Sequence, residues 1–243
     1  MKTMKHDNID VVVLCGGKGT RLRSVIRDRP KPMADIGGKP FLAELLDYVA
    51  KYGFHRFILC AGYKAQDIRS FFERYGRNYE VEFSEESKPI GAGGALRNAL
   101  PFIHSDMCLV LNGDSFCAVE YEKLLIFHAV KSALVTIAVS RMKNAGEYGR
   151  VIIARDGAVK AFEEKATETR DGWVNSGVYV FNKSIVEAMK EKTMLSLERE
   201  VFPMIVGNKL YGFKSSTKTW DIGTPERYVW AQKNLASIFS RSI

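Results

Sequence analysis

The stretch IDVVVLCGGKGTRLR, residues 9–23, decides the fold that this sequence predicts. Its first part, residues 9–14, is an apolar run typical of a strand covered on both faces. Three glycines and two arginines follow within the next nine residues. Glycines let the main chain approach a ligand and point several N–H groups at it. Because arginine offers a planar fork for phosphate oxygens, the stretch predicts a phosphate-binding loop after a buried strand.

Strand-like and helix-like segments alternate through the first half of the chain. Short apolar runs occupy 56–61, 107–114 and 133–140, whereas 41–53 and 65–76 carry apolar residues at helical spacing. This alternation is typical of an α/β protein with helices on both faces of its sheet. We therefore predict a Rossmann-like, mostly parallel sheet.

The second half continues the same domain. Residues 149–165 indicate two strands around an Asp-Gly turn, and 173–181 indicates a further strand. Thr224 suits a helix N-cap and Pro225 a first helical residue, which predicts a C-terminal helix. We find no linker, low-complexity stretch or internal repeat, and so predict one domain over 1–243.

Composition and charge limit the classes of partner. The 243 residues are 46% hydrophobic and 26% charged, as in ordinary globular proteins. The formal net charge of +8 is spread along the chain, which argues against a basic tail for DNA. A spread excess of Lys and Arg favours anionic small molecules as ligands, with nucleic acid as a weaker alternative.

Cysteine usage and hydropathy indicate a cellular compartment. Cys15, Cys60, Cys108 and Cys117 form no CxxC pair, which predicts free thiols in a reducing compartment. The N-terminus lacks an apolar signal core, and no apolar run approaches the roughly 20 residues of a membrane span. We expect a cytoplasmic protein with no membrane partner. The four histidines match no metal-ligand spacing.

The glycine loop differs from two familiar phosphate-binding loops. A P-loop would need glycine where Val12 stands and serine or threonine where Gly19 stands. The dinucleotide fingerprint would need a small residue in place of Leu22. Lys31 lies between two prolines just beyond the loop, in a stiff segment that can hold an ammonium group in place.

Nine stretches together resemble the sugar-phosphate nucleotidyltransferases, also called nucleoside-diphosphate-sugar pyrophosphorylases. The order and spacing of these stretches, nearly end to end, make the resemblance specific. Relatives usually have alanine in place of Cys15, a change that leaves backbone contacts intact. The stretches are LCGGKGTRLR (14–23), RPKPM (29–33), GKPFLAELLDY (38–48), SKPIGAGGALRNAL (87–100), LNGDSF (111–116), GEYGRVII (146–153), FEEK (162–165), VNSGVYVF (174–181) and WDIGTPERY (220–228).

The resemblance implies a reaction. An NTP and a sugar 1-phosphate give an NDP-sugar and pyrophosphate, with Mg²⁺ as cofactor. Within the family, the short length and the text around 24–33 and 89–96 look most like the D-glycero-α-D-manno-heptose 1-phosphate guanylyltransferases. GTP and that heptose 1-phosphate are therefore the expected substrates. About 1–140 would form the nucleotide-binding half, and about 141–243 the half that binds the sugar phosphate.

The resemblance also implies roles for particular residues. Because the reaction joins two polyanions, positioning and charge neutralisation should supply most of the catalysis. The catalytic residues would be Arg21, Lys31, Asp114, Lys165 and Asp221, with Asp114 and Asp221 as ligands of Mg²⁺. The nucleotide would contact Leu14, Cys15, Gly16, Gly17, Gly19, Thr20, Glu86, Gly91, Asn112 and Gly113. The sugar phosphate would contact Gly149, Glu164, Lys165 and Asn175.

The base preference is expected to come from a carboxylate in the base-recognition loop, SEESKPIGAGG. Guanine presents two adjacent donors, N1–H and the 2-amino group, which one carboxylate can accept together. Glu85 and Glu86 both lie in this loop, and Glu86 is the better candidate by its distance from Gly91. Two glutamates after a strand are otherwise an ordinary solvated loop.

Three alternatives stay open. The chain could transfer a cytidylyl, uridylyl or thymidylyl group to another hexose 1-phosphate. A non-catalytic nucleotide-sugar-binding regulatory protein is a second alternative, although this chain keeps the charged residues that such a protein could lose. Nucleic-acid binding would rest on net charge alone. The sequence leaves the oligomeric state open, a homo-oligomer included.

Overall fold

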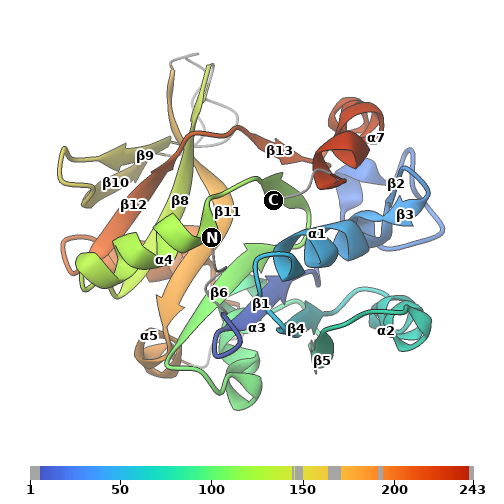
Figure 1. Ribbon diagram of the computed structural model, residues 1–243, viewed down its shortest axis with the longest axis horizontal. Coiled ribbons are helices and arrows are strands. Elements are labelled where there is room, and N and C mark those ends of the chain that lie inside the picture. Colours follow the sequence, from blue (N-terminus) through green and yellow to red (C-terminus); the bar gives the residue numbers. More distant parts are fainter. Residues whose placement is uncertain (1–5, 144, 146–149, 164–170, 191–193, 241–243) are drawn as a thin grey trace.

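The computed structural model describes residues 6–143, 145, 150–163, 171–190 and 194–240. Within that part of the chain, the centre is a seven-stranded sheet in the order β12-β8-β11-β6-β1-β4-β5 (Figure 1). β11 runs antiparallel to both its neighbours, and the other pairs of neighbours are parallel. The predicted α/β fold with a mostly parallel sheet is confirmed. Its strands are β1 (Asp10–Leu14), β4 (Arg56–Ala61), β5 (Glu80–Glu85), β6 (Met107–Asn112), β8 (Val135–Met142), β11 (Gly172–Asn182) and β12 (Leu210–Ser215).

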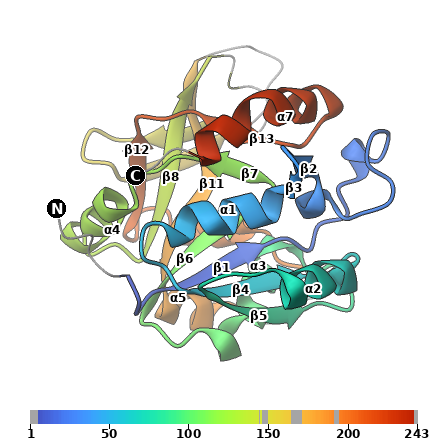
Figure 2. The ribbon, with the colours of Figure 1, turned by 45° about the vertical axis from the view of Figure 1, so that its right-hand side comes forward.

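Helices cover both faces of the sheet because successive side chains of β1 point to opposite faces. Val11 and Val13 join the core beneath α1 and α7, whereas Val12 joins a second core with α3 and α5. Figure 2 shows α1, α4 and α7 on the near side of the sheet. The helices are α1 (Phe41–Ala50), α2 (Ala65–Arg74), α3 (Gly91–Asn98), α4 (Tyr121–Val130), α5 (Lys183–Ala188), α6 (Phe202–Ile205) and α7 (Pro225–Phe239).

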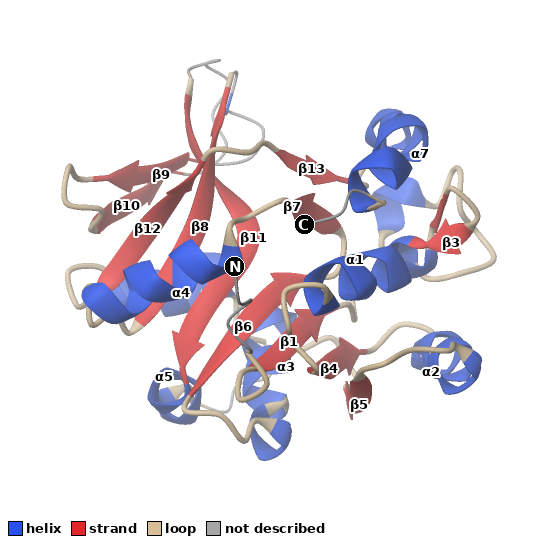
Figure 3. Cartoon of the chain, in the orientation of Figure 1, coloured by secondary structure: helices blue, strands red, loops and turns tan. Residues whose placement is uncertain are grey.

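Three short strand pairs lie outside the central sheet in the described part of the chain (Figure 3). The predicted Asp-Gly turn joins the two strands of one such pair. The predicted N-cap is also confirmed, since the Thr224 hydroxyl accepts a hydrogen bond from the Arg227 backbone N–H. None of the helices in the described ranges is long and apolar enough to span a membrane. The pairs are β2 (Asp35–Ile36) with β3 (Lys39–Pro40), β7 (Ser115–Cys117) with β13 (Thr219–Asp221), and β9 (Arg150–Ile153) with β10 (Val159–Glu163).

One helix was not expected from the sequence. The glycine-rich stretch treated as a base-recognition loop forms α3 from Gly91 onward. Glycine disfavours a helix in isolation, but here the backbone N–H groups of Gly93 and Gly94 donate to the Leu195 carbonyl, at 2.8 and 3.3 Å. Tertiary contact with the chain around Leu195 therefore overrides the local preference.

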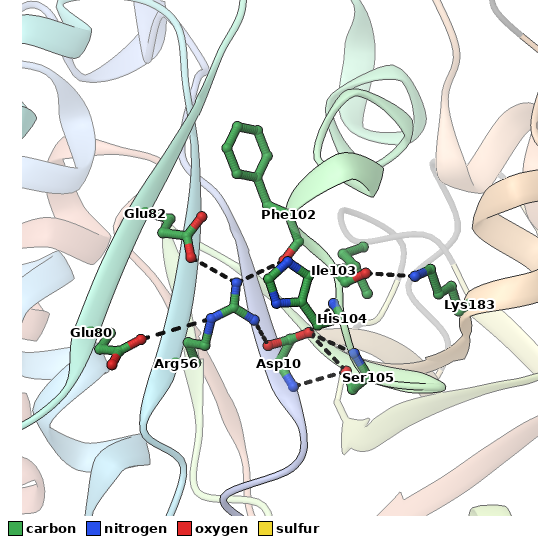
Figure 4. Close-up of polar contacts among 9 residues, drawn as sticks. All are labelled: Asp10, Arg56, Glu80, Glu82, Phe102, Ile103, His104, Ser105 and Lys183. Atoms are coloured by element: carbon green, nitrogen blue, oxygen red, sulfur yellow. Dashed lines mark hydrogen bonds and ion pairs between the residues drawn. The ribbon is translucent and has the colours of Figure 1, made fainter.

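A polar cluster ties the strands together at their amino ends (Figure 4). The buried carboxylate of Asp10 accepts hydrogen bonds from the backbone N–H groups of His104 and Ser105, at 2.6 and 2.9 Å, and from the Arg56 guanidinium. Arg56 also donates to Glu82 on β5, at 2.7 Å. The cluster joins β1, β4 and β5 to the loop before β6. The carboxyl ends of the same strands are thereby positioned at the opposite edge.

Candidate active site

A cavity of about 540 Å³ opens at the carboxyl ends of β1 and β6. In α/β sheets ligands bind at this edge, where loops and helix N-termini converge. Twelve of the residues predicted for the site line it, which brings the first loop, the 86–91 stretch and the end of β6 together. These twelve are Leu14, Cys15, Gly16, Gly17, Gly19, Thr20, Arg21, Lys31, Glu86, Gly91, Asn112 and Asp114.

At Gly16 and Gly19 the first loop approaches its neighbours so closely that a side chain is excluded. A β-carbon at Gly16 would lie 2.8 Å from Glu86 Oε1. Gly19 has a φ of +57°, and a β-carbon there would lie 2.7 Å from the β-carbon of Lys31. Cys15 contributes backbone, because its buried thiol donates to the Cys60 carbonyl at 3.3 Å. Burial raises the pKa of this thiol to about 12, so it stays protonated.

Lys31 and Asp114 form an ion pair across the cavity, with 2.7 Å between Nζ and Oδ2. Lys31 begins a short 3₁₀ turn between its two prolines, and its side chain is only 10% exposed. The Asp114 side chain is 45% exposed, which leaves carboxylate oxygen accessible from the cavity. The prolines therefore hold an ammonium group beside an accessible carboxylate.

The second predicted metal ligand, Asp221, is not among the residues that line the cavity, but its backbone lies beside that of Asp114. β13 pairs with β7 so that Asp221 is opposite Ser115, and the Ile222 N–H donates to the Asp114 carbonyl at 3.1 Å. Arg227 holds the Asp221 carboxylate in an ion pair of 3.1 Å. The short β7–β13 ladder thus brings two residues that are distant in sequence to neighbouring positions.

Gly223 marks the point where the charged groups converge. A β-carbon there would lie 2.6 Å from Asp221 Oδ1, 3.6 Å from Lys31 Nζ and 3.7 Å from Arg21 Nη2. Two cations and one carboxylate therefore surround a single backbone position at the wall of the cavity. In the described ranges no cluster of three or more His, Cys, Asp and Glu side chains forms a ready-made metal site. Two carboxylates with substrate phosphates and water are nevertheless a sufficient set for Mg²⁺.

Glu86 is a half-buried carboxylate with an unsatisfied hydrogen-bond acceptor among the described residues. Its Oε2 atom is buried and has no hydrogen-bond partner among the described residues. Gly16 and Gly62 enclose the side chain, since a β-carbon at Gly62 would lie 2.6 Å from Oε1. Burial raises the pKa of the Glu86 carboxyl above its ordinary value, and the Ile90 backbone N–H partly opposes this shift. Such a group needs a donor, which a ligand in the cavity can provide.

Asn175, a partly exposed residue of β11, is not among the residues that line the cavity. Its Nδ2 donates to the Tyr179 hydroxyl at 2.8 Å, and its Oδ1 accepts from the Gly177 N–H at 3.0 Å. Gly177 has a φ of +72°, and a β-carbon there would lie 2.8 Å from Asn112 Nδ2. Asn175 is therefore linked through Gly177 to Asn112, which lines the cavity.

The structure adds residues that the sequence did not indicate. Glu198 lines the cavity from a helical segment of the second half, Leu197–Val201. Its position depends on the contact between α3 and Leu195, and no local sequence pattern predicts that contact. Gly113 lies outside the lining, but a β-carbon there would lie 2.8 Å from the β-carbon of Cys15. The other unpredicted lining residues are Lys18, Pro32, Pro89, Ala92, Ala95 and Gly223.

Comparison with known proteins gives the family. A family model described as nucleotidyl transferase matches residues 10–238. The chain belongs to this family. Its nucleotidyl transferase domain thus occupies nearly the whole sequence, and the resemblance inferred from the nine stretches is confirmed.

Individual relatives share most of this chain. D-glycero-alpha-D-manno-heptose 1-phosphate guanylyltransferase of Aneurinibacillus thermoaerophilus is 37% identical, over 93% of this chain and 98% of its own length. Mannose-1-phosphate guanylyltransferase of Mycobacterium tuberculosis is 34% identical, over 96% of this chain and 66% of its own length. The crystal structure of HddC from Yersinia pseudotuberculosis complexed with GMP-PN has a TM-score of 0.83 and 36% identity, over 93% of this chain and 99% of that chain.

Three predicted site residues of this nucleotidyl transferase lie outside the described residues. They are Gly149, Glu164 and Lys165, all expected on the sugar-phosphate side. Their roles stay predictions from the family resemblance.

Proposed function

We propose that this nucleotidyl transferase moves a guanylyl group from GTP to D-glycero-α-D-manno-heptose 1-phosphate, giving GDP-heptose and pyrophosphate. Relatives whose names state this activity or guanylyl transfer to mannose 1-phosphate cover nearly the whole chain. The observation that carries the guanine assignment is the buried carboxylate oxygen of Glu86 at the cavity wall, which has no hydrogen-bond partner among the described residues. The product suits the synthesis of a surface polysaccharide such as lipopolysaccharide, capsule or an S-layer glycan.

Guanine selection follows from the chemistry of Glu86. Its carboxylate would accept hydrogen bonds from N1–H and the 2-amino group of the base. Adenine lacks the 2-amino group and presents an acceptor at N1, so the same carboxylate would repel it. The close walls at Gly16 and Gly62 support this role because they prevent the side chain from turning away.

The chemical step is an in-line displacement at the α-phosphorus. An oxygen of the sugar 1-phosphate attacks this phosphorus, the bond to the bridging oxygen breaks, and pyrophosphate departs with that electron pair. Lys31 would neutralise charge near the α-phosphate, and Arg21 would hold the departing pyrophosphate. Both cations lie within 4 Å of a β-carbon position at Gly223, which supports their joint action on one phosphate chain. The attacking oxygen is already anionic and needs no general base.

Mg²⁺ would be held by Asp114 and Asp221 together with substrate oxygens. When bound, it would supply positive charge to the phosphates. The two carboxylates fit this role because Asp221 pairs with Ser115, the residue after Asp114, and both have hard oxygen donors. Lys31 and Arg227 hold these two carboxylates in place by ion pairs.

The sugar phosphate would bind on the side of β11. Asn175 is fixed there by Tyr179 and Gly177, and we propose that it contacts the sugar. Gly149, Glu164 and Lys165 complete this side by resemblance alone. The four free, buried cysteines support action in a reducing compartment, and we expect the cytoplasm.

Turnover with a panel of sugar 1-phosphates tests the proposal. The protein is incubated with Mg²⁺, GTP and, separately, the heptose, mannose and glucose 1-phosphates. Released pyrophosphate is measured, and the nucleotide sugar is identified by its mass. We expect the highest kcat/KM with the heptose. Preference for mannose 1-phosphate would contradict the heptose assignment, and no pyrophosphate with any sugar would contradict guanylyl transfer itself.

A further inference from the structure

A second cavity, of about 310 Å³, lies on the other side of the first loop. All of its charged lining residues are cations, and the remaining lining consists of Gly19, Leu22, Ile26 and Tyr63. A concave site lined by charge of one sign concentrates ions of the opposite sign. Its cations are Lys18, Arg23, Arg27, Arg29 and Lys31.

The second cavity adjoins the catalytic cavity. Lys18, Gly19 and Lys31 line both, so their backbone and side chains form the wall between the two. Gly19 packs against the stem of Lys31, whose ammonium group faces Asp114 on the catalytic side. The second set of cations therefore lies next to the Lys31 side of the catalytic cavity, across this shared wall.

Two of the arginines are available to an anion. Arg29 is engaged, with 2.7 Å to the exposed carboxylate of Asp28. Arg23 lies over the Tyr63 ring, 5.2 Å from its centroid, and forms no ion pair with any of the described residues. Arg27 has no hydrogen bond or ion pair with any residue in the described ranges. Like charges held this close repel one another, and a multivalent anion relieves that repulsion.

We propose that this second cavity binds inorganic pyrophosphate, as a site separate from the catalytic one. The ligand class follows from the cations: two arginine forks suit two linked phosphate groups, each able to accept paired hydrogen bonds. The volume of about 310 Å³ accommodates an anion of this size. The link to turnover rests on the proposed function, in which pyrophosphate is the leaving group. The cavity would take up pyrophosphate as it departs.

Calorimetric titration of the free protein with pyrophosphate tests this site independently of turnover. We expect two binding events in the wild-type protein, one in each cavity. Arg23→Ala/Arg27→Ala should weaken one event by about tenfold or more and leave the other intact, because each lost arginine removes charge-assisted hydrogen bonds. Both arginines are exposed, so the double variant should fold normally. Arg74→Ala, an exposed arginine on α2, is the control and should keep both events.

Three outcomes would overturn the proposal. A single event in the wild-type protein means that the second cavity does not bind pyrophosphate. Two events that persist unchanged in the double variant place the second site elsewhere. Equal affinity for inorganic phosphate at the site would show that it reads one phosphate group, not pyrophosphate. A failure of GTP turnover would appear in a different assay and would leave these binding results unaffected.

Discussion

At the scale of single residues, Glu86 is a carboxylate whose hydrogen bonds the described part of the protein does not fully provide. Within the part of the chain that the structure describes, its Oε2 lacks a hydrogen-bond partner, and burial raises the pKa of the carboxyl. Glu86→Gln should lower kcat/KM for GTP by about tenfold to a hundredfold, the usual effect of losing a charged hydrogen bond. ATP should gain relative to GTP. Glu85→Gln is the control, because Glu85 pairs with Arg69 on the surface. Equal effects of the two changes would contradict the role of Glu86.

The same residue links the pH to binding and stability. A raised folded-state pKa means that folding favours the protonated carboxyl, so this contribution to stability is present at low pH and is lost as pH rises through that pKa. Glu86→Gln should therefore raise the melting temperature at neutral pH relative to wild type. KM for GTP should rise in the wild type as pH falls toward the raised pKa, and this dependence should flatten in the variant.

The two carboxylates of Asp114 and Asp221 allow a separate test. Asp114→Asn and Asp221→Asn should each lower kcat by about a hundredfold or more, since each removes charge that holds the metal in the transition state. Asp156→Asn, in the β9–β10 turn, is the control. A variant that retained more than about a tenth of the wild-type rate at saturating Mg²⁺ would show that its residue is not a ligand.

The site residues that could be predicted are those with a recognisable pattern in the neighbouring sequence. Glycines, a lysine between prolines and an aspartate after an apolar run all have local signatures, and the structure places Gly16, Lys31 and Asp114 around one cavity. Glu198 had no such signature, because it reaches the cavity only through tertiary packing. Lys18 lines both cavities, and this position too results from tertiary packing.

At the scale of elements, α3 and the chain around Leu195 depend on each other. Gly91 has a φ of +76°, and a β-carbon there would lie 2.5 Å from the Leu195 carbonyl oxygen. Gly91→Ala should therefore destabilise the protein by about 1–3 kcal/mol, the range expected for a strained left-handed residue, and should also reduce kcat/KM for GTP. Chemical denaturation and kinetics measure the two effects. Gly76→Ala, with nothing within 4 Å of its β-carbon position, is the control and should be nearly neutral.

The polar cluster at the amino ends of the strands should matter for stability alone. Asp10→Ala leaves Arg56 without its buried partner and frees two backbone N–H groups, at a cost of about 3 kcal/mol or more. Because this cluster lies at the edge opposite the cavity, kcat at 25 °C should change little in the folded fraction. Thermal unfolding against turnover separates the two quantities. A large loss of kcat without a fall in melting temperature would contradict this view.

Whether a segment forms a helix or a strand was predictable where its pattern of apolar residues was clear. The buried strands β1, β4 and β6 are nearly continuous apolar runs, and their positions match the prediction to within a residue or two. α3 was not predictable, because three glycines in eight residues oppose a helix until Leu195 packs against them. The β7–β13 pair was missed because each strand has only three residues.

At the scale of the whole molecule, one sheet carries both halves of the chain. β11 and β12 from the second half pair with β6 and β8, so the predicted halves share a core. The sequence could give the α/β class from its alternating runs. The placement of Asp221 beside Asp114 required the family fold, since no spacing rule joins positions so far apart. The division of labour between the halves stays a prediction.

A competition among nucleotides tests the central claim most directly. The protein receives Mg²⁺, D-glycero-α-D-manno-heptose 1-phosphate and an equimolar mixture of GTP, ATP, CTP, UTP and dTTP, and the nucleotide sugars are counted by mass spectrometry. A carboxylate that attracts guanine and repels adenine predicts GDP-heptose in at least about tenfold excess over every other product. A mixture without preference, or one dominated by another nucleotide sugar, would contradict the account.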